Sequence, residues 1–92
     1  MYHRVSHGRS DPAKYDELVG LVPAVRAAIR QLPGCQDVRA GVDRATGRTV
    51  SVSTFDTLEH AQFARESLGE PLARLAAAGW HGEAPEIYED IG

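Results

Sequence analysis

Apolar and polar residues alternate in four segments of the chain, and this alternation predicts four β-strands. The first segment, YHRVSH, places His3, Val5 and His7 on one face and residues 2, 4 and 6 on the other, and Gly8 ends it. The other three segments span residues 37–42, 49–55 and 86–91. Between the second and third segments, the turn residues of DRATG predict an antiparallel hairpin.

A helix is expected after the first strand, because apolar residues recur there every three or four positions. Ser10 or Asp11 can cap this helix, with Pro12 at its first position. The apolar stripe consists of Leu18, Leu21, Val22, Val25, Ile29 and Leu32, and the Pro-Gly pair at residues 33–34 ends it. Pro23 lies inside the stripe and removes one backbone hydrogen bond, so we expect a kink or a break near Leu21.

A second helix is expected after the hairpin. Asp56 or Thr57 can cap it, and a ragged apolar side runs from Leu58 to Leu68. Gly69 and Pro71 interrupt this element, and a further short helix is expected over residues 71–79.

The resulting order, βαββαβ, is the ferredoxin-like α+β arrangement, in which an antiparallel sheet carries both helices on one face. Residues 1–92 form one domain with a thin core, because a chain of this size buries little more than about 60% of its unfolded surface. Both faces of the sheet carry apolar residues, yet the helices cover only one of them. A homodimer that stacks sheet on sheet would cover the other face.

Composition narrows the range of partners. The net charge is −3 and no stripe of basic residues is present, so nucleic acid is not an expected partner. The apolar runs are far shorter than the about 20 residues of a membrane span. Cys35 is the single cysteine and cannot form an internal disulfide, and the first residues lack a secretory signal pattern, so we expect a cytoplasmic protein. Cys35 itself is expected to be a small buried filler.

Several of these features together resemble a known family. They are the first strand, the helix closed by LPGC, the hairpin that runs into FDTLEHA, and the final PEIYEDI strand. In this combination the chain resembles the dimeric α+β barrel proteins of the antibiotic biosynthesis monooxygenase (ABM) type. That family includes oxygenases that act on anthrones and hydroquinones without metal or organic cofactor, and also haem-degrading enzymes. The haem-degrading pattern includes an Asn on the first strand, and this chain contains no Asn.

The resemblance implies a cofactor-free monooxygenase that oxidises a flat aromatic phenol, anthrone or quinol, with no cofactor and no metal. Such a reaction requires a dry cavity, a base or hydrogen-bond donor, and aromatic walls. The alternative is a non-catalytic dimeric barrel that binds a small apolar ligand or acts as a stress-responsive or accessory domain. The sequence shows no compact acid–base constellation that would decide between the two.

The candidate catalytic residues are His3, whose imidazole titrates near neutral pH, and Tyr88, whose hydroxyl could hold a quinone oxygen. His3 could equally be a half-buried histidine or one that contacts a second copy. His3 and His7 lie too far apart along a straight strand to share a metal ion. Arg4 and Arg39 are candidates of second rank. A shift of one residue in the register would exchange His3 for Arg4, and Tyr88 for Ile87, in the pocket.

The candidate pocket residues are Phe55, Phe63, Trp80 and His81. Phe55 and Phe63 are core aromatics first, but in the resembled fold the space between helices and sheet is also the ligand cavity. Trp80 could close over a flat ligand or simply cap the apolar layer. His81 is expected to be exposed. The functional hypothesis for it is a gate residue at the mouth of the pocket, and not the chemical base.

Overall fold

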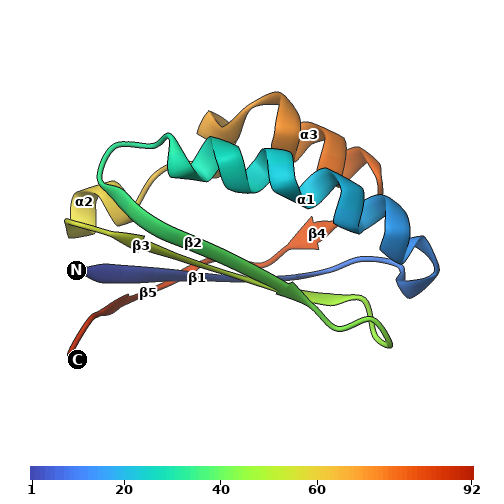
Figure 1. The fold of residues 1–92 in the computed structure, drawn as a ribbon, viewed down its shortest axis with the longest axis horizontal. Helices are drawn as coiled ribbons and strands as arrows, with labels where there is room; N and C mark the ends of the chain where they lie inside the picture. Colours follow the sequence, from blue (N-terminus) through green and yellow to red (C-terminus); the bar gives the residue numbers. More distant parts are fainter.

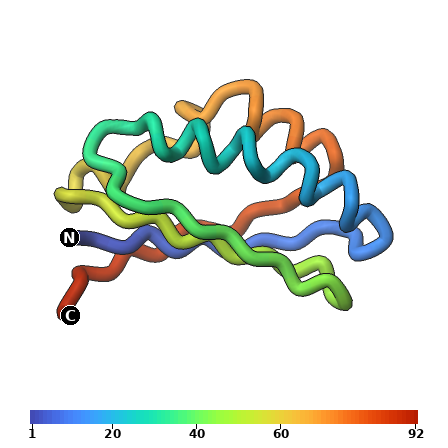
Figure 2. The backbone as a smooth tube through the Cα atoms, viewed as in Figure 1, coloured from blue at the N-terminus to red at the C-terminus, as the bar shows by residue number.

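Helices cover one face of a twisted antiparallel sheet in the computed structural model, which describes all residues from 1 to 92 (Figure 1). The strands are β1 (Tyr2–Arg9), β2 (Cys35–Val42), β3 (Arg48–Phe55), β4 (His81–Gly82) and β5 (Glu86–Glu89). Their order is β2-β3-β1, and β4 and β5 pair with opposite ends of β1. The two chain termini therefore lie at the same end of the sheet (Figure 2).

The helical elements are the 3₁₀ turn η1 (Pro12–Lys14), α1 (Tyr15–Arg30), α2 (Leu58–Ala61), the 3₁₀ turn η2 (Arg65–Leu68) and α3 (Glu70–Ala77). The helices α1 and α3 lie side by side over the sheet (Figure 1). None of the helices is both long and apolar enough to cross a membrane.

The predicted hairpin and helix caps are confirmed. The amide of Asp43 donates to the carbonyl of Arg48 at 2.8 Å, and Gly47 takes the positive φ of 78° that closes the turn. Asp11 accepts a hydrogen bond from the amide of Ala13, and the Thr57 hydroxyl accepts one from the amide of His60. These short-range signals are reliable because each is satisfied within a few residues.

The break expected as one alternative at Pro23 and the continuous second helix are both wrong. Pro23 does not break α1, which runs unbroken from Tyr15 to Arg30, because the apolar stripe packed on the sheet holds the helix across one missing hydrogen bond. The helix expected from Leu58 to Leu68 is instead the single turn α2, an irregular segment, and η2. The two-residue strand β4 was also not expected from the sequence.

Strand register decides which side chains face the helices. On β1, Tyr2, Arg4 and Ser6 lie opposite Phe55, Ser53 and Ser51 of β3, on the helix-covered face. The core on this face consists of Ile29, Val38, Phe55, Ala61 and Leu68. We call the other face, with the side chains of His3, Val5, His7, Val52 and Thr54, the open face, because no helix covers it (Figure 1).

Candidate functional site

A cavity of about 470 Å³ lies between the sheet and the helices α1 and α3. Its walls are mostly apolar, with Leu18, Val22 and Ile29 from α1, Val38 from β2, and Leu72 and Leu75 from α3. A volume in this range is typical of sites for small organic ligands. The cavity forms because the sheet side chains beneath the helices are small here: Ser6, Ser51 and Ser53 take positions that larger residues would fill.

The most buried charge in the molecule, Arg4, lies in the cavity wall, and its residue surface is only 5% exposed. Its Nη1 donates to the carbonyls of Ala61 at 2.9 Å and Phe63 at 2.7 Å, and its guanidinium carbon lies 3.7 Å from the centroid of the Phe63 ring. Burial, and after it the neighbouring Arg65 guanidinium, lowers the pKa of Arg4. The side chain is nevertheless a cation at any physiological pH.

Arg4 also explains why the second helix is broken. In a continuous helix the carbonyls of Ala61 and Phe63 would accept hydrogen bonds from amides one turn later. Here they accept from the guanidinium instead, and the chain leaves helical geometry between α2 and η2. The irregular segment therefore serves to bring Phe63 and two free carbonyls to the buried cation.

Trp80 forms one end of the cavity and is held in place on three sides. Its Nε1 donates to the hydroxyl of Thr49 at 2.9 Å. Gly8 and Gly82, paired between β1 and β4, leave room for the indole: a Cβ at Gly8 would lie 2.6 Å from Nε1. The guanidinium carbon of Arg65 lies 5.6 Å from the ring centroid, so the indole is a fixed wall of the cavity with a cation beside it.

The charged residues that line the cavity are all arginines: Arg4, Arg26 and Arg65. No Asp, Glu, His or Cys lines it, although acidic residues outnumber basic ones in the chain as a whole. The remaining polar lining consists of hydroxyl groups from serine, Thr49 and Tyr15. A neutral or anionic ligand therefore fits this cavity, and a cationic one does not.

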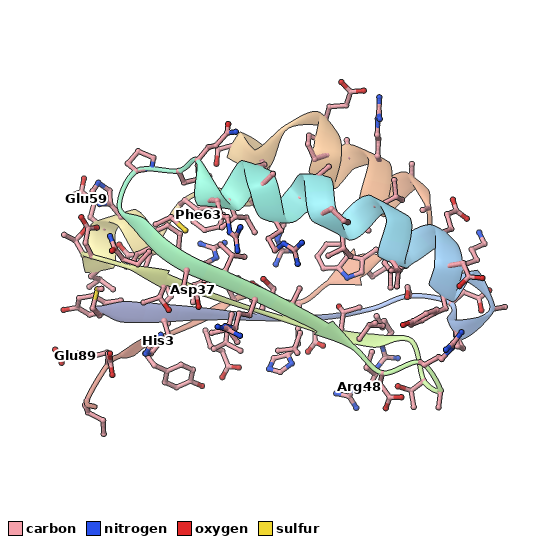
Figure 3. The ribbon with its side chains drawn as sticks, viewed as in Figure 1. His3, Asp37, Arg48, Glu59, Phe63 and Glu89 are labelled. Atoms are coloured by element: carbon pink, nitrogen blue, oxygen red, sulfur yellow. The ribbon has the colours of Figure 1, made fainter.

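Two of the predicted pocket residues, Phe63 and Trp80, line the cavity. Phe63 lies between the sheet and the helices (Figure 3) and packs against Phe55, with ring centroids 5.6 Å apart. Phe55 itself is 0% exposed and belongs to the core beside the cavity. His81 is exposed on β4 and outside the lining, because its neighbour Trp80 takes the inward position there.

The predicted catalytic residue His3 lies on the open face of the sheet, away from the helix-side cavity (Figure 3). Tyr88 is the partner of His3 in the pairing of β5 with β1 and is outside the cavity lining. The strand register places Arg4 in the cavity wall and His3 outside it. The alternating sequence pattern could not decide which of these two neighbours faces the pocket. His3 Nδ1 is 2.9 Å from the Thr54 hydroxyl and Nε2 is 3.7 Å from the carboxylate of Asp90.

Tyr88 is half exposed, and its hydroxyl donates to the carboxylate of Glu86 at 2.8 Å. This hydrogen bond raises the pKa of the phenol, so Tyr88 stays protonated near neutral pH. Arg39 is exposed on β2, where it pairs with Asp37. Cys35 is half-buried against the core, and burial raises the pKa of its thiol, as expected for a filler residue.

Sequence reasoning missed Arg65 as a site residue and ranked Arg4 low. The alternation around Arg4 carried a usable signal, since it placed this residue on the same face as Tyr2. Arg65 gave no signal, because it reaches the cavity only through the irregular segment after α2.

By its fold and cavity, this protein belongs to the class of ferredoxin-like α+β domains with a ligand-sized cavity between the helices and the sheet. The chain has the fold of the antibiotic biosynthesis monooxygenases, as comparison with solved structures shows. A crystal structure of an antibiotic biosynthesis monooxygenase has a TM-score of 0.77 and 16% identity, with 100% of both chains covered. No protein-family model and no curated protein matches the sequence.

Two further structures have the same fold. SnoaB, a cofactor-independent oxygenase from Streptomyces nogalater, has a TM-score of 0.72 and 14% identity, covering 99% of this chain and 93% of that chain. Rv0793 from Mycobacterium tuberculosis has a TM-score of 0.72 and 13% identity, covering 99% of this chain and 95% of that chain. At such identities the likeness concerns the fold, and function depends on the residues of this cavity.

Proposed function

We propose that this protein is a cofactor-independent monooxygenase that oxidises a flat aromatic phenol, anthrone or quinol with O₂. The observation that carries the proposal is the buried Arg4 guanidinium in the wall of an otherwise apolar cavity with aromatic walls, Phe63 and Trp80. Apolar walls favour a flat ring system, and a desolvated cation favours an anion formed on that ring. SnoaB, with the same fold, supports the choice of reaction class.

The chemistry starts with ionisation of the ligand. A positive charge at hydrogen-bond distance lowers the pKa of a bound phenol or of the enol form of an anthrone, so the anion becomes accessible near neutral pH. No carboxylate or imidazole lines the cavity, so the proton passes to solvent through the cavity mouth. Arg4 then acts as the electrostatic stabiliser of the anion and not as a base.

The oxidation needs only O₂ as co-substrate. The electron-rich ring carbon of the anion transfers one electron to O₂, the resulting radical pair forms a carbon–oxygen bond, and a peroxide results. Loss of water from the peroxide breaks the O–O bond and leaves a quinone. One oxygen atom of O₂ stays in the product and the other leaves as water. The two hydrogens of that water come from the methylene carbon of an anthrone, or from the ring carbon and the hydroxyl group of a phenol or quinol, and a proton from solvent replaces the one released at ionisation.

Oxygen uptake tests this function. The purified protein, with no metal or cofactor added, is given a panel of anthrones and hydroquinones, and uptake is compared with a boiled control. We expect oxygen uptake, and we expect Arg4→Gln to lower it strongly, since glutamine keeps a polar side chain but carries no charge. Arg39→Gln, on the exposed edge strand, is the matched control and should leave uptake unchanged.

The predicted catalytic roles of His3 and Tyr88 define the competing outcome of this experiment. If His3→Ala or Tyr88→Phe abolishes uptake while Arg4→Gln does not, the chemistry takes place at the open face and the assignment to the helix-side cavity is wrong. Loss in the Arg4 variant alone supports the cavity.

A second candidate function is ligand binding without catalysis. The lack of any carboxylate, imidazole or thiol in the cavity lining favours it, because most acid–base and nucleophilic catalysis requires one of these groups. Binding of the same aromatic compounds without oxygen uptake would select this function.

We also propose that a second copy of the chain covers the open face and forms a dimeric barrel. Val5 and Val52 lie side by side on this face and are only half-buried in the single chain. Val52→Asp should therefore yield a monomer in size-exclusion chromatography with light scattering. Ala27→Asp, on the exposed side of α1, serves as the control. A monomeric wild type at all concentrations would contradict the proposal.

A further inference from the structure

Three arginines line the cavity without an acidic partner, and two of them, Arg4 and Arg65, also lie against an aromatic ring. Neither takes part in an ion pair: the chain's ion pairs involve Arg39, Arg74 and three histidines. Inside the chain the two groups donate only to backbone carbonyls. Arg65 Nη2 donates to the carbonyl of Glu83 at 2.6 Å, and each guanidinium lies near an aromatic ring.

Such a pair is costly for the folded protein. Like charges repel each other, and here Arg4 is buried while Arg65 is half-buried, so water screens their repulsion only in part. The effect is visible in Arg4, whose pKa is lowered by burial and by Arg65. Most arginines of the chain lie outside ion pairs, so the distinguishing feature of Arg4 and Arg65 is their place in the wall of the cavity, each beside an aromatic ring.

An anion formed on the reacting ring neutralises only one of these charges. In the proposed oxidation that anion lies against Arg4, beside Phe63. Arg65 is left beside Trp80 at the end of the cavity, with a planar fork of donors that matches a carboxylate.

We propose that the ligand of this cavity is an aromatic carboxylic acid and that Arg65 binds its carboxylate. The ring system then extends from the indole of Trp80 along the apolar walls, with its reacting oxygen toward Arg4. Arg65 is thus a specificity residue: it selects acids over their neutral analogues. The role of Arg4 rests on the proposed function, whereas the carboxylate at Arg65 can be tested without any reaction.

The test is a binding measurement by calorimetry in the absence of O₂. The probes are anthracene-2-carboxylate and its neutral isostere, anthracene-2-carboxamide. The wild-type protein should bind the acid at least about tenfold more tightly than the amide, the size of difference expected from one charge-assisted contact.

Three variants assign the preference to Arg65. Arg65→Gln keeps a polar side chain but loses the charge, and it should bind acid and amide equally. Arg65→Lys retains the charge and should keep most of the preference. Arg39→Gln removes an exposed arginine and should leave the preference unchanged. Circular dichroism and urea unfolding confirm that the variants fold.

Equal binding of acid and amide by the wild type would overturn the proposal, and so would a preference that persists in Arg65→Gln. These outcomes are independent of oxidation. A preference for the acid with no oxygen uptake leaves the Arg65 assignment standing and contradicts only the oxygenase. Oxygen uptake from phenols without any preference for the acid supports the oxygenase and contradicts the Arg65 assignment.

Discussion

The two faces of the sheet use polar residues in opposite ways. On the helix-covered face, Arg4 is almost fully buried, bonds to backbone carbonyls and has no carboxylate partner. On the open face, His3 and His7 of the same strand lie near the carboxylates of Asp90 and Glu86, at 3.7 and 3.9 Å. The helix-covered face therefore carries a fixed charge of one sign, and the open face carries groups of opposite sign placed near one another at the protein surface.

This difference indicates that the charge of a ligand affects binding more strongly in the cavity than on the open face. A cation in a dry cavity has no competing counter-ion, so it acts strongly on whatever enters. The pairs on the open face are screened by solvent and ions, so each contributes little. Neighbouring residues of one strand thus have different surroundings only because they face opposite sides.

The largest effect is expected from the core beside the cavity. Phe55→Ala removes a side chain that is 0% exposed and should lower the free energy of unfolding by about 3–5 kcal/mol, from lost burial and the cavity left behind. Thr54→Ala, next to it on the open face, loses only its hydrogen bond to His3 and should cost less than about 1.5 kcal/mol. Urea unfolding measures both. Similar losses in the two variants would contradict the contrast between the faces.

Arg4→Met tests the buried cation for stability. The carbonyls of Ala61 and Phe63 lose their donor, and leaving them unsatisfied should cost about 1–3 kcal/mol in urea unfolding. Arg4→Lys, whose ammonium keeps a charged donor with nearly the reach of the guanidinium, should recover much of that loss. If Arg4→Met is as stable as the wild type, the guanidinium does not hold the segment between α2 and η2.

Gly8→Ala tests the fixed position of Trp80. The new Cβ would lie 2.6 Å from Trp80 Nε1 and 2.8 Å from the carbonyl oxygen of His81, so the indole must move away from Thr49. Overpacking of this kind costs about 1–3 kcal/mol, and the emission of the single tryptophan should shift to longer wavelength. Gly41→Ala is the control, because its Cβ would meet only Val50 at 3.5 Å. An unchanged emission in Gly8→Ala would show that the indole is free to move.

The smallest effect is a pH dependence on the open face. The pKa of Asp90 is lowered, first by the hydrogen bond from the amide of Gly92 and then by the charge of His3. A folded-state pKa below the unfolded value, about 3.9, means that this stabilisation is present above that pH and is lost as the pH falls through the folded pKa. Asp90→Asn should therefore be slightly less stable than the wild type at pH near 6, and the difference should vanish in strong acid. Urea midpoints across this range check the sign, and a difference that grows in acid contradicts it.

The sequence predicts much of the fold, because its signals are local. The alternation of the four strands, the DRATG turn, and the caps at Asp11 and Thr57 each depend on neighbours within a few residues. The order βαββαβ then restricts the topology to few choices. Phe63 and Trp80 are found as cavity residues for the same reason, since large aromatics in a small domain face its interior.

The errors arise where distant contacts override local ones. Pro23 predicts a break, but packing of α1 on the sheet outweighs one lost hydrogen bond. The apolar side from Leu58 to Leu68 predicts a helix, but Arg4, far away in sequence, takes the carbonyls that would continue it. No window of the sequence contains both partners of that contact.

The sequence by itself determined the four main strands, the first helix, the ferredoxin-like order and the two faces of β1. Only the tertiary structure decided which of those faces the helices cover, and so placed Arg4 in the cavity wall and His3 on the open face. The physical reason is that alternation has a period of two and is silent about direction. The direction is fixed when Phe55 and its partners are buried under α1, and Arg65 joins Arg4 only once the irregular segment folds over that core.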